Sequence, residues 1–363
     1  MDIFLLPIIV VFGFIVCCRL RIRKIACIES DYLSYDNCLC IKGILSMVIL
    51  LDHIAGIIVP RDKLLGIFHS VGFLAVAVFF FLSGYGVECQ RTKRENYLNN
   101  TFILRKSITL LIPMFIINVI YLIFECTMHI FEKNINHFNF ALYLFDILGI
   151  YIINGTAWYI KDLFILLILF FVFYRYISPQ IISDISMFIS ILVITLFRAI
   201  RWNGGTGQNW GMLFCFFVGI LWGRYYKQIT TFVKKHYLLC LLIIGGLTAI
   251  FIGLFSTYYN LRIGKLLWRN LGTTCFVILF TILLMLIEFR GTAVKWLGGI
   301  SLEVYLIHFL IVNYVTRFPN KVLAVYGAIL ISIIAAVIVK PMVSFSVNRL
   351  TYLTNRLVKR NES

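Results

Sequence analysis

Long apolar stretches recur from one end of this sequence to the other, and they limit it to folds that cross a lipid bilayer. A helix of roughly 18 to 20 apolar residues spans the hydrocarbon core, because each residue adds about 1.5 Å. Of the 363 residues, 61% are hydrophobic and 13% are charged, whereas a soluble domain is about half apolar. The sequence therefore predicts an all-α integral membrane protein, a polytopic bundle of helices.

The apolar stretches predict about eleven transmembrane helices, with no soluble domain or linker between them. Positive charge follows the first stretch, at Arg19–Lys24, whereas a secretory signal carries its charge before the apolar segment. The first stretch is therefore predicted to be a retained membrane anchor. The predicted spans are residues 3–18, 41–59, 66–87, 107–127, 157–177, 181–200, 211–226, 237–257, 271–289, 297–315 and 322–342.

The basic residues fall mainly in short loops, so the net charge of +17 indicates membrane topology and not nucleic-acid binding. If the first loop is cytoplasmic, 22 of the 33 Lys and Arg residues lie inside and 11 lie outside. The N-terminus is then external and the C-terminus cytoplasmic. Residues 139–153 are too few to span and are predicted to be interfacial or re-entrant on the outer side. The loop Arg201–Trp210 should share that side, where its two Trp residues could anchor the chain or pack on a sugar.

Ionisable side chains inside the predicted spans mark candidate functional sites, because they are costly to place in lipid. Lys42 begins the second span, and Asp52 and His53 lie deep within it. Eleven residues turn a helix about 20° beyond three full turns, so Lys42 and His53 share a stripe and lie roughly 16 Å apart. This stripe is typical of a polar cleft wall, with Asp52 about 100° away from His53. Alternatively, Lys42 snorkels to the headgroups and His53 makes a hydrogen bond between helices.

A second set of polar residues lies in the predicted span 297–315. Ser301, Tyr305 and His308 are spaced i, i+4, i+7 and therefore share one helix face. A second deep histidine favours a polar interior, although a histidine bonded to a neighbouring helix explains it equally well.

Five sequence elements, in this order, resemble the signature of the membrane-bound acyltransferase 3 family. Lys42, ten intervening residues and His53 match its pattern of a basic residue, ten residues and a histidine, with Lys where Arg is commoner. The segment Phe79–Gly84 is similar to its Phe-Phe-x-x-Ser-Gly element. The other elements are Phe102, Arg105 and Pro113 at the start of the next helix, Trp158 at the start of a later one, and the late group of Ser301, Tyr305 and His308.

The resemblance implies a ten-helix acyltransferase core over residues 37–345. Residues 1–36 would add one N-terminal helix with a basic loop, and residues 346–363 would form a cytoplasmic basic tail. It implies transfer of an acyl group, usually acetyl, from cytosolic acetyl-CoA to a hydroxyl of a cell-surface polysaccharide or lipid-linked sugar, at the plasma (inner) membrane. No bound cofactor is expected. No metal site is predicted either, because Cys38 and Cys40 are too close in sequence for the usual zinc pair.

The residues that carry the resemblance are compatible with that chemistry. Arg105, Lys106 and Lys42 are predicted at the cytoplasmic mouth, where they would bind the CoA phosphates. His53 and Lys42 are the candidate catalytic residues. His53 would be the general base for the acceptor hydroxyl, or would take the acyl group covalently. Further candidate cleft or acceptor residues are Asp52, Ser83, Trp158, Ser301, Tyr305 and His308.

Two other classes of membrane protein are compatible with part of this pattern. A transporter or flippase for a lipid-linked glycan would also use buried His, Asp and Lys, although the internal repeat that many transporters carry is not evident. A purely structural membrane subunit is the third class, and the stripe from Lys42 to His53 argues against it.

Overall fold

The computed structural model describes residues 13, 18–25, 28, 32–58, 68–69, 71–132, 139–147, 153–201, 211–258, 261 and 267–361. Most of the predicted span 3–18 and the residues 202–210 of the predicted outer loop lie outside this set. The chain divides into two compact units. The first consists of Met1–Ile49, Ser70–Asn99 and Ile168–Gly299, and the second of Leu50–His69, Asn100–Leu167 and Ile300–Ser363.

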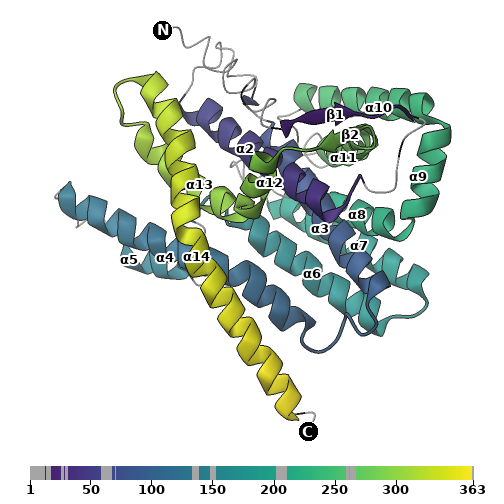
Figure 1. The fold of residues 1–363 in the computed structure, drawn as a ribbon, viewed down its shortest axis with the longest axis horizontal. Coiled ribbons are helices and arrows are strands. Elements are labelled where there is room, and N and C mark those ends of the chain that lie inside the picture. The colour runs from purple at the N-terminus through teal and green to yellow at the C-terminus, as the bar shows by residue number, and fades with distance from the viewer. Residues whose placement is uncertain are drawn as a thin grey trace. The chain divides into compact units, whose positions relative to one another are not determined.

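The first unit is a set of packed helices in which α3 lies along α8 and α10 lies along α11. Figure 1 shows α10 and α11 as neighbouring green helices. Its helices are the first part of α2 (Tyr35–Ile57), α3 (Gly72–Lys93), the last part of α6 (Trp158–Tyr176), α7 (Gln180–Arg201), α8 (Phe214–Arg224), α9 (Tyr226–Lys235), α10 (Tyr237–Thr257), α11 (Arg269–Leu284) and α12 (Thr292–Gly299).

Glycines set the close approach of α3 and α8. A side-chain carbon on Gly84 would overlap the backbone carbonyl of Phe216, and one on Gly219 would overlap that of Phe81. Small residues allow such close backbone contact between membrane helices. The glycine of the Phe79–Gly84 element therefore has a packing role.

A short strand pair joins the N-terminal segment to the end of α11. The strands β1 (Leu20–Ile22) and β2 (Ile287–Phe289) pair antiparallel (Figure 1). Arg290 donates to the Glu288 carboxylate at 3.0 Å, and Arg23 lies 3.5 Å from that carboxylate. The hydrogen bond from Arg290, together with the charge of Arg23, holds the pKa of Glu288 below its usual range.

The second unit is built around α13, which packs against α14 and α4. Figure 1 shows α13 and α14 side by side. The buried carboxylate of Glu303 on α13 accepts a hydrogen bond from Lys340 of α14 at 3.0 Å. The helices of this unit are the last part of α2, α4 (Phe102–Phe131), α5 (Phe140–Ile147), the first part of α6, α13 (Ser301–Val315) and α14 (Lys321–Asn361).

The prediction of an all-α polytopic membrane protein is confirmed. Six of the described helices, α2, α3, α4, α7, α10 and α14, are long and apolar enough to cross a membrane, or seven if α12 and α13 count as one broken span. This number does not confirm the predicted eleven. Helix α6 has 19 residues but carries Lys161, Asp162 and Arg175, and α8 has only 11 residues.

Three predicted spans differ from the observed helices for local reasons. The predicted span 271–289 ends early because α11 stops at Leu284 and the next residues form β2. The predicted span 297–315 is interrupted at Ile300, which separates α12 from α13. Helix α14 continues well beyond residue 342, with Pro341 inside it.

Candidate functional site

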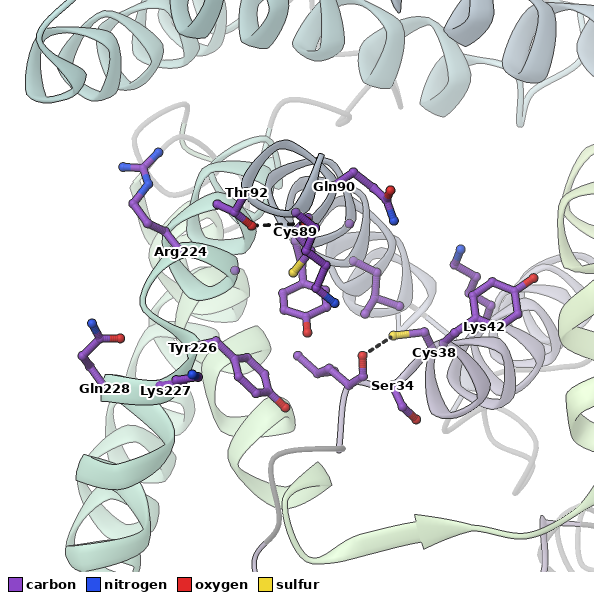
Figure 2. A pocket seen from close by; sticks show the side chains of 17 residues that line it. Ser34, Cys38, Lys42, Cys89, Gln90, Thr92, Arg224, Tyr226, Lys227 and Gln228 are labelled. Atoms are coloured by element: carbon purple, nitrogen blue, oxygen red, sulfur yellow. Dashed lines mark hydrogen bonds between the residues drawn. The ribbon is translucent and has the colours of Figure 1, made fainter. Parts of the chain in front are cut away.

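A basic cavity of about 780 Å³ lies in the first unit. This basic cavity is lined by the segment before α2 and by residues of α2, α3, α8 and α9. Figure 2 shows Lys42 and Cys38 on one side of it, Tyr226 and Lys227 on the opposite side, and residues of α3 between them. None of the described residues that line it is acidic. Its four cations are Lys42, Lys93, Arg224 and Lys227, and its aromatic residues are Tyr35, Tyr85 and Tyr226.

The four cations of the basic cavity are not equivalent. Arg224 donates to the fully buried Glu88 at 2.8 Å and to Asp184 at 2.6 Å, so its charge is already compensated. Lys42 is half-buried, Lys93 and Lys227 are exposed, and none of the three forms an ion pair within the part of the chain that the structure describes. Three ammonium groups are therefore available to an anionic ligand.

The stripe between Lys42 and His53 is packed along its middle. Ser46 is fully buried and donates to the carbonyl of Gly43 at 2.9 Å, and Ile49 is also buried. The predicted cleft wall is therefore limited to the two ends of the stripe. Helix α2 contributes Lys42 to the first unit and His53 to the second.

His53 and His308 form a histidine pair in the second unit, with ring centroids 5.0 Å apart. His53 is half-buried, and no hydrogen bond joins it to another described residue. His308 is fully buried, and its Nδ1 lies 3.0 Å from the carbonyl oxygen of Val304. A carbonyl can only accept, so Nδ1 carries the proton and Nε2 has the lone pair. Nε2 has no hydrogen-bond partner among the residues described.

Aromatic side chains pack around the histidine pair. The rings of Phe309 and His53 pack edge to face, with centroids 5.3 Å apart. A side-chain carbon on Gly155 would come within 3.1 Å of the Phe309 ring. The ring centroids of Tyr305 and His308 are 6.1 Å apart. A half-buried imidazole beside a fully buried one is suited to proton transfer, because the first can meet a substrate while the second holds its place.

The other candidate residues occupy several positions. Ser83 donates to the carbonyl of Phe79 at 2.8 Å, within its own helix. Arg105 donates to the hydroxyl of Thr101, and the Lys106 ammonium lies 5.7 Å from the centroid of the Phe102 ring. Both cations belong to the second unit, whereas Lys42 lines the basic cavity of the first.

Three further candidates take their positions from the helices that carry them. Asp52 is half-buried on α2, and Trp158 is half-buried at the start of α6. Ser301 is buried at the first turn of α13, seven residues before His308.

Sequence reasoning did not assign Lys93 and Lys227 to a site. Both belong to the set of basic residues predicted to be cytoplasmic, and the positive-inside pattern already accounted for them. A signal that could have found Lys93 is its position at the end of α3, an apolar helix that carries a family element.

Comparison with known families agrees with the predicted fold class and family. A family model described as an acyltransferase domain, of the acyltransferase 3 type, matches residues 39–340. No curated protein and no solved structure matches the chain. The match covers most of the sequence, so the chain belongs to this acyltransferase family and is a multi-pass membrane acyltransferase.

Proposed function

We propose that this acyltransferase moves an acyl group, with acetyl as the preferred one, from cytosolic acyl-CoA to a hydroxyl of a cell-surface polysaccharide or a lipid-linked sugar. The proposed location is the plasma (inner) membrane. The observation that carries the donor part of this proposal is the basic cavity, because it presents three uncompensated lysines and no described acidic side chain.

The basic cavity suits the nucleotide end of acyl-CoA. That end carries several phosphate charges, which lysines bind as point charges. Tyr85 and Tyr226 offer rings on which an adenine base can stack. Lys42, Lys93, Arg224 and Lys227 all belong to the basic residues predicted to face the cytosol, where CoA is found.

The histidine pair suits the transfer step. In the proposed reaction His53 takes the proton of the acceptor hydroxyl while that oxygen attacks the thioester carbonyl carbon. The new ester bond forms, the C–S bond breaks, and the CoA thiolate leaves and receives the proton from His53. A positioned base of this kind contributes about 10² to 10⁴ in rate.

The remaining candidates keep their proposed roles. Arg105 and Lys106 would add to the binding of the CoA phosphates from α4. The candidate cleft or acceptor residues would be Asp52, Ser83, Trp158, Ser301, Tyr305 and His308.

Two cysteines allow a direct test of the donor cavity. Cys38 and Cys89 both line it. Purified protein in nanodiscs is treated with a maleimide, with and without CoA, and modification is followed by mass spectrometry. CoA should slow the modification of both, whereas Cys126, half-buried on α4 in the second unit, should react at an unchanged rate. Equal rates with and without CoA would exclude the basic cavity as the donor site.

A second assay separates the acyltransferase reaction from transport. Purified protein with acetyl-CoA and a panel of glycan or lipid-linked sugar acceptors should release free CoA and yield an acetylated sugar. Movement of a lipid-linked glycan across liposomes without CoA release would instead support a flippase.

A further inference from the structure

The hydroxyl of Tyr121 bonds to both backbone groups of one step in the hydrogen-bond ladder of α13. In an α-helix the carbonyl of residue i accepts from the N–H of residue i+4, and Leu306 and Leu310 are such a pair. The Tyr121 hydroxyl, from α4, accepts from the N–H of Leu310 at 2.7 Å and donates to the carbonyl of Leu306 at 3.5 Å. A side chain inserted at such a step changes the local path of a helix.

A buried polar network holds the same carbonyl from a second direction. Asn154 uses its two N–H groups on the Leu306 carbonyl at 3.1 Å and on the Asn118 side-chain oxygen at 3.0 Å. Its own side-chain oxygen accepts from the Thr156 hydroxyl at 2.7 Å and from the Thr156 N–H at 3.2 Å. Both N–H groups and the oxygen of the Asn154 side-chain amide are therefore hydrogen-bonded. A polar group satisfied in this way favours one geometry.

The turn held in this way is the turn that carries His308. His308 lies between Leu306 and Leu310, and its Nδ1 bonds to the carbonyl of Val304 in the same helix. The direction of its imidazole ring therefore depends on the path of the backbone at this turn. Its Nε2 has no hydrogen-bond partner among the described residues, and the histidine ring packed against it is that of His53. A buried acceptor without a partner has a desolvation cost, which points to a functional reason for keeping it.

We infer that Tyr121 is a positioning residue: its hydroxyl fixes the α13 turn that sets the imidazole of His308 against His53. This inference rests on the proposed role of His53 as the base. When His53 takes the proton from the sugar hydroxyl it becomes cationic. The neutral ring of His308 packs beside it and keeps a lone pair on Nε2, which can stabilise that charge. Tyr121 touches neither the substrate nor His53 and acts only through the turn.

Tyr121→Phe is the informative variant, because it removes the hydroxyl and keeps the ring. Without the hydroxyl, Leu310 N–H and Leu306 carbonyl can bond to each other directly, so the helix closes and the protein stays folded. The His308 turn then takes a different path. We expect kcat to fall about 10- to 100-fold, with KM for acetyl-CoA within about twofold, since small displacements of catalytic groups have effects of this size.

Tyr314→Phe is the matched control. The Tyr314 hydroxyl also joins α13 to α4, through a 2.6 Å hydrogen bond to Glu125, but it lies beyond the His308 turn. The control should keep kcat within about twofold of the wild type while losing a similar α13–α4 hydrogen bond. Equal losses of kcat in the two variants would make Tyr121 a purely structural residue and overturn the inference.

A measurement that needs no acceptor separates this inference from the proposed function. Diethyl pyrocarbonate modifies accessible neutral imidazoles, and mass spectrometry reports the rate at each histidine. The wild type and Tyr314→Phe should protect His308, and Tyr121→Phe should change the rates at His308 and His53. A wild type that transfers no acyl group would reject the proposed function, and unchanged modification rates in Tyr121→Phe would reject the positioning role on their own.

Discussion

The basic cavity and the histidine pair differ in how their polar groups are held. Around the cavity, Lys93 and Lys227 are exposed and Lys42 is half-buried, and none has an ion-pair partner among the described residues. In the second unit His308 is fully buried, and its turn is fixed by hydrogen bonds with Tyr121 and Asn154. The cavity thus keeps mobile charges, whereas the pair has a fixed geometry.

This difference separates two kinds of sensitivity. A lysine on a flexible stem follows its anionic partner and tolerates small changes of shape around it. An imidazole that must meet a reacting proton depends on placement to within a fraction of an ångström. Changes at the basic cavity should therefore act mainly on KM for the acyl donor, and changes at the histidine pair should act mainly on kcat.

The largest effect is expected from His53→Ala. Loss of the proposed general base should lower kcat by about 10² to 10⁴ while the protein remains folded and inserted. If His53 had only a packing role, its removal would cost on the order of 1 kcal/mol of helix association and would spare turnover. Steady-state kinetics on purified protein, with thermal unfolding as a check on folding, decide between these outcomes.

Two histidine variants accompany that measurement. His236→Ala, at the junction of α9 and α10 in the first unit, should leave kcat unchanged. His308→Ala should lower kcat by less than His53→Ala. Near-normal turnover in His53→Ala with activity lost in His308→Ala would move the base to α13 and reverse the two roles.

The next effect is expected at the lysines of the basic cavity. Lys42→Ala should raise KM for acetyl-CoA about tenfold, because a charge-assisted contact at a half-buried site contributes about 1.5 kcal/mol or more. Lys227→Ala should raise it about threefold, because this lysine is exposed and screened by salt. Neither variant should change kcat by more than about twofold.

Lys295→Ala is the control for charge alone. Lys295 belongs to the same unit but pairs with Asp36 at 2.7 Å and is not part of the cavity lining. Its removal should leave KM unchanged. An equal rise of KM in all three variants would mean that net charge, and not the cavity, attracts the donor.

Much of the helical framework could be predicted from the sequence, because the length of an apolar run decides where a membrane helix lies. The predicted span 237–257 matches α10 and the predicted span 181–200 matches α7 within a residue or so. Tertiary contacts decide the other boundaries. The predicted span 271–289 includes Ile287–Phe289, but this segment pairs with β1 instead of continuing α11.

The candidate site was predictable where a polar residue interrupts an apolar run. Lys42, His53 and His308 stand out in this way, and the structure brings the two histidines together. Lys227 does not stand out, because basic residues are expected at cytoplasmic helix ends. In the sequence Tyr121 cannot be distinguished from an ordinary core aromatic residue. Its hydroxyl accepts from the N–H of Leu310, which is 189 residues away, so no local pattern predicts the contact.

A smaller effect is expected for Arg105→Ala. Arg105 is half-buried on α4 and already bonds to Thr101, so we expect it to contribute less to the proposed donor binding than Lys42, which has no ion-pair partner among the described residues. KM for acetyl-CoA should rise about two- to threefold with kcat unchanged, as expected for a contact that binds ground state and transition state alike. A lower kcat at constant KM would place Arg105 beside the reacting atoms, whereas an unchanged KM and kcat would remove it from the donor site.

The smallest effects are expected when one methyl group is added in each region, by Gly86→Ala at the basic cavity and by Gly155→Ala beside the histidine pair. Gly86 lines the basic cavity and has open space where a side-chain carbon would stand, whereas such a carbon on Gly155 would come within 3.1 to 3.4 Å of three carbons of the Phe309 ring. Gly86→Ala should leave KM and kcat unchanged and stabilise α3 by up to about 1 kcal/mol, because alanine is the better helix former. Gly155→Ala should displace the Phe309 ring by a few tenths of an ångström and so disturb its contact with His53. We expect kcat to fall about two- to fivefold, with KM for the donor unchanged. If Gly86→Ala raises KM, the cavity is as tightly fitted as the histidine pair. If Gly155→Ala leaves kcat intact, the placement of His53 does not depend on Phe309, and the contrast between mobile charges and fixed geometry loses its main support.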